Sequence, residues 1–421
     1  MRDPIILLCL IFLTMCGSQK PVEVTNTSLH SGLTEKIGNF SMELLYFTAQ
    51  SQPPGTNLII SPITVWTVLA VITEGATGET LKQICKALRI VPKRRAAIRK
   101  EYQNIAQWLQ VNTTTVELQK FNALFVDEQS SPLIDFQSSA KEYDTRMIGV
   151  NFTDSNVTSQ LINAAISTVT RGRISKLVES SDLDNSNLIL ISALYFKGQW
   201  TVPFNSSYTK PETFYDSHGN RLGQVNMMYN RHTYPYANIE SLQARVIEIP
   251  YGQYNRLSML IMLPYTGVSI NQMFYNLANI SLDAVFEELK VSVEDYADDE
   301  VDCFIPRFKI ESSLTLTDSL KKMDIKDVFD QRKARLPLMT RVPVYVSKII
   351  HKAEIEVTEE GTTASAVTGA EFSNRIGITR FEANRPFCYL IIEKVTNSIA
   401  FGGFYHTPSK HPCAVRYNGL K

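Results

Sequence analysis

The sequence EEGTTASAVTGA at residues 359–370 decides the fold, because it has the pattern of a β-strand that belongs to no neighbouring sheet. Every second residue from Thr362 to Ala370 is Thr or Ala, so one face of this strand carries only small side chains. Such a strand gains backbone pairing rather than hydrophobic core when it joins a sheet, and it can exist both outside and inside one. Gly361 provides a flexible entry. Composition alone also fits a mobile surface loop, since Thr, Ala, Ser and Gly are common in loops.

Composition and charge restrict the classes of partner. The chain has 421 residues, and its 42 Lys and Arg residues balance its 42 Asp and Glu residues. No overall charge therefore selects nucleic acid or a membrane as a partner. The sequence contains no Gly-x-Ser-x-Gly, His-Glu-x-x-His, phosphate-loop or Gly-x-Gly-x-x-Gly motif, which argues against an enzyme and against a cofactor. His406, His411 and Cys413 lie close together but offer only three ligands, so we predict no metal site.

The amino-terminal residues predict entry into the secretory pathway. Residues 5–14 form an apolar block that has the length of a signal-peptide core and is too short to span a bilayer. Cleavage near Gly17 gives a signal peptide at residues 1–17, and we expect a secreted, extracellular protein. Seven Asn-x-Ser/Thr sequons support this expectation and are candidate glycosylation sites: Asn26, Asn39, Asn112, Asn151, Asn156, Asn205 and Asn279.

The cysteines are too sparse to form a disulfide scaffold. Two of the six would leave with the signal peptide, and the other four are Cys85, Cys303, Cys388 and Cys413. Four buried thiols and one bridge with two thiols are both compatible with the sequence, so the fold must depend on its hydrophobic core.

Hydrophobic patterns along the chain alternate between helix and strand. The most apolar internal run, residues 188–200, predicts a central strand that is buried on both faces. Helical spacing is found at residues 33–50, 61–71, 78–90, 157–169, 282–289 and 314–323. Strands are predicted at residues 57–60, 116–126, 244–250, 257–264, 303–310, 344–357, 388–393 and 398–405. Without repeats or linkers, this mixture indicates an α/β chain that is not divided into smaller domains.

Two separate motifs near the carboxyl end resemble the serpin family. Serpins carry a reactive-loop hinge of the form Glu-Glu-Gly-Thr, then a variable residue and a run of Ala or Ser. The corresponding residues are Glu359, Glu360, Gly361, Thr362, Thr363, Ala364, Ser365 and Ala366. Counting along the family's spacing from the hinge places the reactive bond between Arg375 and Ile376. Counting back from the family's Asn-Arg-Pro-Phe motif, at residues 384–387, gives the same bond, so the loop contains no insertion.

Further motifs extend the resemblance from Gly32 to Pro408. The family's Asn-x-x-x-Ser-Pro-x-Ser motif has Thr64 in place of its last serine, and its Asn-Ala-x-Tyr-Phe-Lys-Gly-x-Trp motif has Ser192 in place of asparagine. We expect the shorter serine to leave His351 or a backbone group without a partner, at a cost of about 1 to 3 kcal/mol. The resemblance implies that the shutter and breach of the sheet contain Ser61, Thr64, Ser192, Trp200 and His351.

A dense group of cations follows Pro92, where a helix is predicted to begin. Like charges at helical spacing and at a helix amino end are unfavourable by about 0.3 kcal/mol each, which indicates a use outside the fold. In some serpins the corresponding helix binds sulfated polysaccharide. The resemblance therefore implies a heparin-like partner at Lys93, Arg94, Arg95, Arg99 and Lys100. A solvated charged face, partly compensated by Glu101, is the alternative.

The resemblance implies one serpin domain at residues 32–408, followed by a polar tail at residues 409–421. The expected fold is mixed α+β, with roughly nine helices around three β-sheets and an exposed reactive loop. The expected function is that of a monomeric suicide-substrate inhibitor, which traps a serine protease covalently while its cleaved loop enters the main sheet.

Arg375 implies that the target is a trypsin-like serine protease, because such enzymes carry a carboxylate in the specificity pocket. Ile376 and Gly377 resemble the activation junctions of trypsin-family zymogens, so the target would regulate an extracellular zymogen cascade. A general trypsin inhibitor is the alternative for specificity. A non-inhibitory serpin that acts as a binding or carrier protein is the alternative for function.

Overall fold

Strand β4 (Leu188–Gly198) occupies the centre of a five-stranded sheet, the main sheet, in the computed structural model, which describes residues 32–295, 299–360 and 378–408. Every residue of β4 is buried except Lys197, which is half-buried, as the apolar run predicts. The strand order is β11-β12-β4-β2-β3, with β11 (Phe308–Thr315), β12 (Lys348–Val357), β2 (Val116–Asp127) and β3 (Arg146–Val150).

Two further sheets complete the β-structure of the described residues. The six-stranded sheet has the order β1-β15-β14-β9-β8-β7, formed by Leu58–Ile60, Ser398–Tyr405, Phe387–Glu393, Leu257–Pro264, Ala244–Tyr251 and Tyr236–Ile239. The four-stranded sheet has the order β13-β10-β6-β5, formed by Thr379–Glu382, Val301–Pro306, Arg221–His232 and Lys210–Tyr215. The expected mixed α+β fold with three sheets is therefore confirmed.

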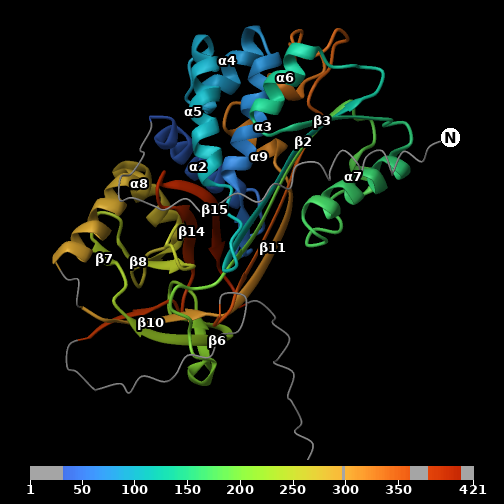
Figure 1. The fold of residues 1–421 in the computed structure, drawn as a ribbon. Coiled ribbons are helices and arrows are strands. Elements are labelled where there is room, and N and C mark those ends of the chain that lie inside the picture. Colours follow the sequence, from blue (N-terminus) through green and yellow to red (C-terminus); the bar gives the residue numbers. More distant parts are fainter. Residues whose placement is uncertain (1–31, 296–298, 361–377, 409–421) are drawn as a thin grey trace, which may run out of the picture.

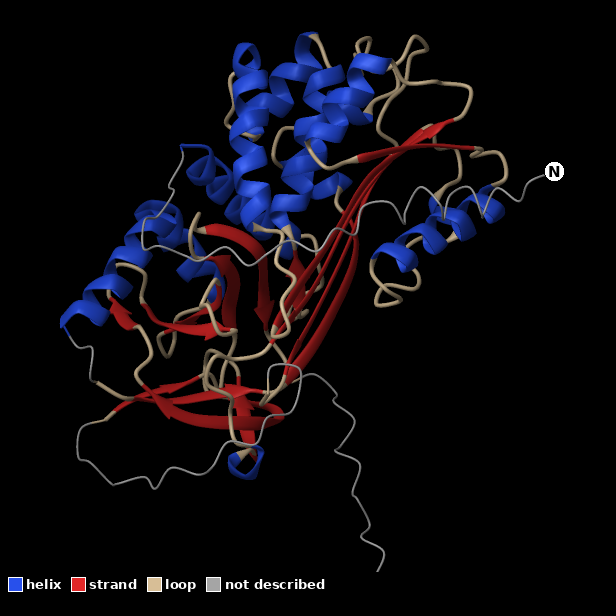
Figure 2. Cartoon of the chain, in the orientation of Figure 1, coloured by secondary structure: helices blue, strands red, loops and turns tan. Residues whose placement is uncertain are grey.

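Most helices gather near one end of the main sheet, and the four-stranded sheet lies at the other end (Figures 1 and 2). The gathered helices are α2 (Gly32–Ala49), α3 (Pro62–Gly75), α4 (Gly78–Ala87), α5 (Arg95–Trp108), α6 (Ile134–Glu142) and α9 (Thr317–Lys322). Helix α7 (Ser155–Val169) covers one face of the main sheet, and α8 (Ile270–Asp295) lies beside β7 and β8. Short 3-10 turns occupy Pro92–Arg94, Ser180–Asp182, Ser206–Tyr208 and Asp327–Phe329.

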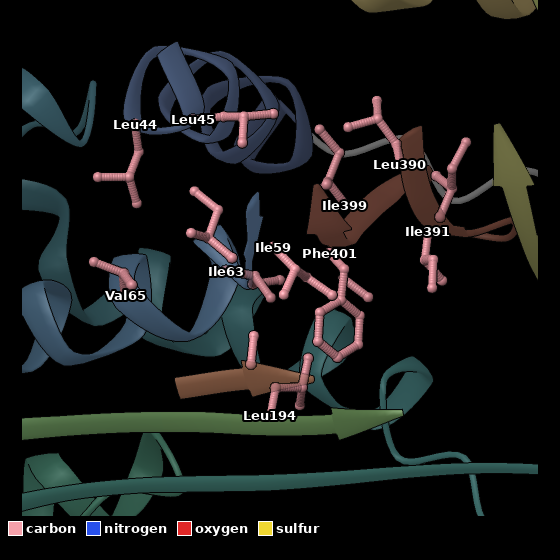
Figure 3. Close-up of a cluster of buried hydrophobic side chains, with 14 of the residues drawn as sticks. Leu44, Leu45, Ile59, Ile63, Val65, Leu194, Leu390, Ile391, Ile399 and Phe401 are labelled. Carbon is pink, nitrogen blue, oxygen red and sulfur yellow. The ribbon is translucent and has the colours of Figure 1, made fainter. Parts of the chain in front are cut away.

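The largest core joins the helices to all three sheets. Helix α3 begins at the predicted Ser61–Pro62 start, and every one of its residues except Glu74 is buried. In Figure 3, Leu45 of α2 lies on the same side of β14 and β15 as Leu390, whereas Phe401 of β15 lies on the other side, toward Leu194 of the main sheet. This core fixes α3 directly beneath the centre of the main sheet, where the two contact each other.

The structure corrects three predicted boundaries. The strand predicted at residues 303–310 is divided at Arg307, because β10 pairs with β6 and β11 pairs with β12 in a different sheet. The alternating buried positions are odd-numbered up to Ile305 and even-numbered from Phe308, so the alternation shifts by one residue where the chain changes sheets. The strand predicted from Val344 begins at Lys348, and the helix predicted at residues 314–323 is reduced to the short α9.

We predict that Gly403→Ala destabilises the fold, because β15 passes very close to β1 and β14 at this point. A Cβ atom at Gly403 would collide with the carbonyl oxygen of Leu58 and the hydroxyl of Tyr389. That hydroxyl donates a hydrogen bond to the same carbonyl at 3.0 Å. We expect the free energy of unfolding to fall by about 3 kcal/mol, measured by urea denaturation.

Gly38→Ala in α2 is the matched control. An added Cβ there meets nothing within 4 Å. This substitution should stabilise the protein by up to about 1 kcal/mol, because alanine is the better helix former. Equal effects of the two substitutions would contradict the packing argument.

Candidate strand-insertion site of the main sheet

Strands β4 and β12 form a parallel pair in the middle of the main sheet. Their register runs from Ile189 opposite Lys348 to Tyr195 opposite Glu354. Each strand is antiparallel to its other neighbour, β2 and β11 respectively. A strand placed between β4 and β12 could thus be antiparallel to both. Antiparallel pairing is slightly more stable per residue than parallel pairing, so such an insertion replaces one weaker ladder with two stronger ones.

The hinge segment continues directly from β12. This strand ends at Val357, and the described chain continues through Thr358 to Glu360. A chain that reverses direction after Glu360 runs antiparallel to β12, which is the direction that the space between β4 and β12 requires. The predicted hinge residues from Gly361 to Ala366, and the predicted reactive bond, lie outside the described residues.

The open end of the parallel pair is closed by the loop that follows β4. The indole nitrogen of Trp200 donates to the carbonyl oxygen of Thr358 at 2.8 Å, and the backbone nitrogen of Phe204 donates to that of Glu359 at 2.8 Å. The Trp200 ring stacks on Tyr251, with ring centroids 4.2 Å apart. These contacts join the end of β12 to the chain that leaves β4, so an entering strand must break or displace them.

The carboxylate of Glu359 anchors the start of the hinge to the four-stranded sheet and its approach. Only 7% of Glu359 is exposed. The Thr209 hydroxyl donates to this carboxylate at 2.8 Å, and the Arg307 guanidinium lies 3.6 Å from it. Sequence reasoning identified Glu359 but missed Thr209 and Arg307. Arg307 lies in a segment that resembles the family's Leu-Pro-Lys/Arg-Phe motif, but that motif does not reveal its contact with Glu359, and Thr209 belongs to no such motif.

A ring of hydrogen bonds lies beneath the centre of the parallel pair. His351 of β12 is directly opposite Ser192 of β4, and its Nδ1 is 2.9 Å from the serine hydroxyl. The backbone nitrogen of Ser61 donates to His351 Nε2 at 2.9 Å, which places the imidazole proton on Nδ1. The Ser192 hydroxyl contacts that of Thr64 at 2.6 Å, and Thr64 donates to the carbonyl oxygen of Ser61 at 2.9 Å.

This ring satisfies both nitrogens of His351, so the expectation that Ser192 would leave it unpaired was wrong. Serine reaches the imidazole because the two residues are register partners in adjacent strands. Burial lowers the pKa of His351 to about 4, so the imidazole is neutral at pH 7. A polar residue that sequence reasoning missed lies next to the ring. Asn122 of β2 is opposite Ser192 and 2% exposed, and its carboxamide has no hydrogen-bond partner among the described residues.

The basic segment after Pro92 is divided between the interior and the surface. Lys93 and Arg94 lie in a 3-10 turn before α5, and they are exposed together with Lys100. Arg95 donates to the carbonyl oxygen of Thr73. Arg99 is 18% exposed and lies 3.5 Å from Glu74 and 3.1 Å from Glu142. Two of the five predicted polysaccharide ligands are thus engaged in contacts that hold α5 against α3 and α6.

The remaining candidates are the cysteines and the groups that could bind a metal ion. Cys85, Cys303 and Cys388 are buried and form no disulfide, while Cys413 lies outside the described residues. The described residues contain no group of three or more His, Cys, Asp or Glu side chains that could hold a metal ion. Among the helices in the described ranges, none has the length and hydropathy needed to cross a membrane.

These features define a class of protein in which the main sheet has a central parallel pair, β4 and β12, and β12 leads directly into a segment with the pattern of a further strand. Comparison with known proteins identifies the family. The family model described as "Serpin (serine protease inhibitor)" matches residues 35–408. The chain belongs to the serpin family. Members of this family are protease inhibitors rather than enzymes, and they form complexes with serine proteases.

The similar proteins cover nearly the whole chain. Human Serpin B9 is 30% identical over 386 residues, which are 89% of this chain and 99% of Serpin B9. Leukocyte elastase inhibitor from Bos taurus is 31% identical over 376 residues, which are 86% of this chain and 96% of that protein. The crystal structure of human thyroxine-binding globulin with bound thyroxine has a TM-score of 0.77 at 25% identity, covering 90% of this chain and 99% of that one.

The comparisons overturn the expectation of secretion. Serpin B9, leukocyte elastase inhibitor and Serpin B3 are intracellular serpins without signal peptides. The predicted signal peptide, residues 1–17, lies outside the described residues. The signal-peptide pattern in these residues is weak, because the negative charge of Asp3 offsets the positive charge of Arg2 and leaves no positive region before the apolar block.

The predicted glycosylation sites depended on the same expectation. Asn39, Asn112, Asn151 and Asn156 are exposed, and Asn205 is half-buried. The carboxamide oxygen of Asn205 accepts a hydrogen bond from the backbone nitrogen of Ser207 at 2.9 Å. Asn279 lies in α8, and Asn26 lies outside the described residues. Exposure alone does not make a sequon a glycosylation site, because the modification requires passage through the secretory pathway.

We predict that the protein loses stability as the pH falls from 7 to 5. The folded pKa of His351 is about 4, whereas an unfolded histidine titrates near pH 6.5. The unfolded chain therefore binds more protons over the interval between these values, and protonation favours unfolding. The contribution of this residue should fall by about 2 kcal/mol between pH 7 and pH 5, measured as the free energy of unfolding in urea at each pH.

Two variants separate this effect from general acid sensitivity. His351→Gln should show a smaller loss between pH 7 and pH 5, because the titrating group is gone. His218→Gln should keep the full loss, because His218 is exposed. An unchanged pH dependence in His351→Gln would contradict the assignment.

Proposed function

We propose that this serpin is a suicide-substrate inhibitor of trypsin-like serine proteases. The observation that carries the proposal is the parallel pair β4·β12, with the hinge following directly on β12, so that a reversal of the chain gives the direction needed to enter the pair. In the proposed reaction, the protease serine attacks the carbonyl carbon of Arg375 and forms an ester bond. The bond to Ile376 breaks, and the new amine takes its proton from the protease histidine.

The mechanical part of the proposal follows from strand geometry. After cleavage, residues 362–375 are attached to the protein only through the hinge. A strand of this length extends about 45 to 50 Å, so its full entry between β4 and β12 would carry the attached protease along the length of the sheet. The inward face of the strand would carry only small residues, because the interior offers little room for larger side chains. These residues are Thr362, Ala364, Ala366, Thr368 and Ala370. The energy would come from the gain of two antiparallel ladders.

Specificity in this proposal depends on Arg375. An arginine before the cleaved bond fits a pocket that ends in a carboxylate, whereas elastase has a small pocket. This serpin would therefore differ in target from the leukocyte elastase inhibitors that it resembles. The Ile376–Gly377 sequence favours a target that activates other proteases, and a general trypsin inhibitor is the alternative. The carrier alternative has less support, because leukocyte elastase inhibitor is 31% identical to this chain, whereas thyroxine-binding globulin is 25% identical.

We predict that the protein forms a complex with trypsin that survives boiling in detergent. Ala364→Arg should convert it into a substrate, because a strand with arginine on its inward face cannot enter the sheet without burying an unpaired charge. The measurement is the fraction of serpin in the covalent complex relative to cleaved serpin on a denaturing gel.

Ser365→Arg is the matched control, because the neighbouring side chain points to the opposite face. It should retain most of the complex, whereas Ala364→Arg should yield almost only cleaved chain. The proposed insertion mechanism is wrong if the two variants behave alike, and the inhibitory function is wrong if the unmodified protein yields no complex.

We also propose a heparin-like partner for the basic segment that follows Pro92. Only the exposed residues of this segment, Lys93, Arg94 and Lys100, belong to the proposed binding site. Replacing Lys93, Arg94 and Lys100 with alanine should lower the salt concentration that elutes the protein from heparin. Replacing Arg99 should instead lower the free energy of unfolding, because Arg99 holds α5 against its neighbours. Unchanged elution of the triple variant would exclude this site.

A further inference from the structure

A cavity of about 320 Å³ lies where the chain returns from the reactive loop to the four-stranded sheet. It is lined by the second half of α8, the start of β7, and the first residues of β10 and β13. These elements meet at one corner of the molecule, far from α6 (Figure 1). The lining residues used below are Tyr234, Tyr236, Glu288, Val291, Asp299 and Thr379.

The lining combines apolar surface with negative charge. Tyr234 is 5% exposed and Tyr236 is half-buried, while 47% of Val291 is open to solvent. Glu288 and Asp299 are exposed carboxylates at the rim, and within the described chain neither one takes part in an ion pair. Aromatic rings beside carboxylates suit a long cationic side chain, whose stem packs on the rings while its charge meets the carboxylates.

Most cations around this corner are paired with other acids, and the exception is Arg245 of β8, the register partner of Asn238, which forms no ion pair among the described residues. Arg231 contacts Asp302 at 2.7 Å, Lys290 contacts Glu294 at 4.0 Å, and Arg380 contacts Glu382 at 3.0 Å. The exposed Glu287 and Glu300 add negative charge without a partner in the described ranges. The four carboxylates of Glu287, Glu288, Asp299 and Glu300 form no ion pair in the described ranges and outnumber Arg245, so the net charge around the cavity is negative.

The end of α8 strengthens this conclusion. Its last turn contains Glu294 and no basic residue. Negative charge at a helix carboxyl end is repelled by the helix dipole, and the exposed Lys290–Glu294 pair offsets this repulsion only slightly. Their presence is consistent with a role toward something outside the chain.

The covalent chain fixes the cavity close to the predicted reactive bond. Thr379 lies only four residues after Arg375, so the two Cα atoms are at most about 14 Å apart. A folded protease domain of some 200 residues has a radius of gyration of roughly 16 Å. Any protease whose active site holds Arg375 therefore extends over the corner where this cavity opens.

We propose that this cavity docks a lysine or arginine side chain from a basic loop of the target protease. The proposal rests on the inhibitory function proposed above and adds a second point of contact beyond the cleaved bond. The occupant is the protease itself, because charge complementarity and continuity with Thr379 place its surface there. The contact accelerates encounter with basic proteases, since exposed charges at the edge of an interface act mainly on the association rate.

The test compares rates of covalent complex formation with two probes, trypsin and trypsin whose lysines have been acetylated. The variant is Glu288→Gln with Asp299→Asn. At low ionic strength it should react with trypsin about threefold to tenfold more slowly than the unmodified serpin, and the difference should vanish near 1 M salt. Acetylation should slow the unmodified serpin more than the variant, because the cations it removes are the proposed occupants.

The matched control carries Glu128→Gln and Asp135→Asn at the opposite end of the molecule, where both residues are exposed. It loses the same charge and should react at the unmodified rate. Cleavage of a small peptide substrate confirms that acetylated trypsin is active, and equal midpoints of thermal unfolding confirm that the variants are folded.

The outcomes separate the two proposals. Suppose that the unmodified serpin forms the complex and that the cavity variant reacts with each probe as fast as the unmodified serpin does. The docking site is then wrong and the inhibitory function stands. If the control slows as much as the cavity variant, only the net charge matters and the docking site is again wrong. If the unmodified serpin forms no complex, the inhibitory function is wrong and the docking site falls with it.

Discussion

The parallel pairing of β4 with β12 is the interaction on which the rest of the structure depends. A sheet in which these neighbours were antiparallel could not accept a strand antiparallel to both. Here the neighbours are parallel, and the chain that leaves β12 needs only to reverse to take the required direction. The same pair that holds the sheet closed is therefore the place where it can gain a strand. The surrounding contacts determine how firmly it stays closed.

Those contacts act at two positions along the pair. In the middle of the pair, Ser192 belongs to β4 and His351 belongs to β12. Their hydrogen bond must therefore break if these two strands separate. The ring is anchored through Ser61 and Thr64 on the buried helix α3, which cannot follow either strand without disturbing the core. At the hinge end, Glu359 and Trp200 join β12 to other parts of the fold. Separation of the pair therefore requires its parallel ladder and these polar contacts to break.

The sequence predicted β4 from its apolar run, because a strand buried on both faces has a distinctive composition. The ring around His351 was located through the family resemblance, since its members are distant in the chain and show no local pattern. Thr209 and Arg307 were missed, because contacts between sheets leave no periodic signal. Arg95 and Arg99 were included in a surface site, because a count of charges does not show which side chains turn inward. Composition and period thus predict elements, whereas polar contacts between elements require the structure.

An irreversible inhibitor places unusual demands on recognition. Once a protease is trapped, affinity no longer matters, so the choice among targets is made by their relative rates of reaction. Many proteases accept arginine before the cleaved bond, and the energy gained by the main sheet is the same for all of them. Discrimination must therefore act on the encounter, where surface charge is most effective. The proposed docking cavity, a few residues beyond the proposed reactive bond, would meet this requirement without changing the sheet, so selectivity and trapping could be adjusted separately.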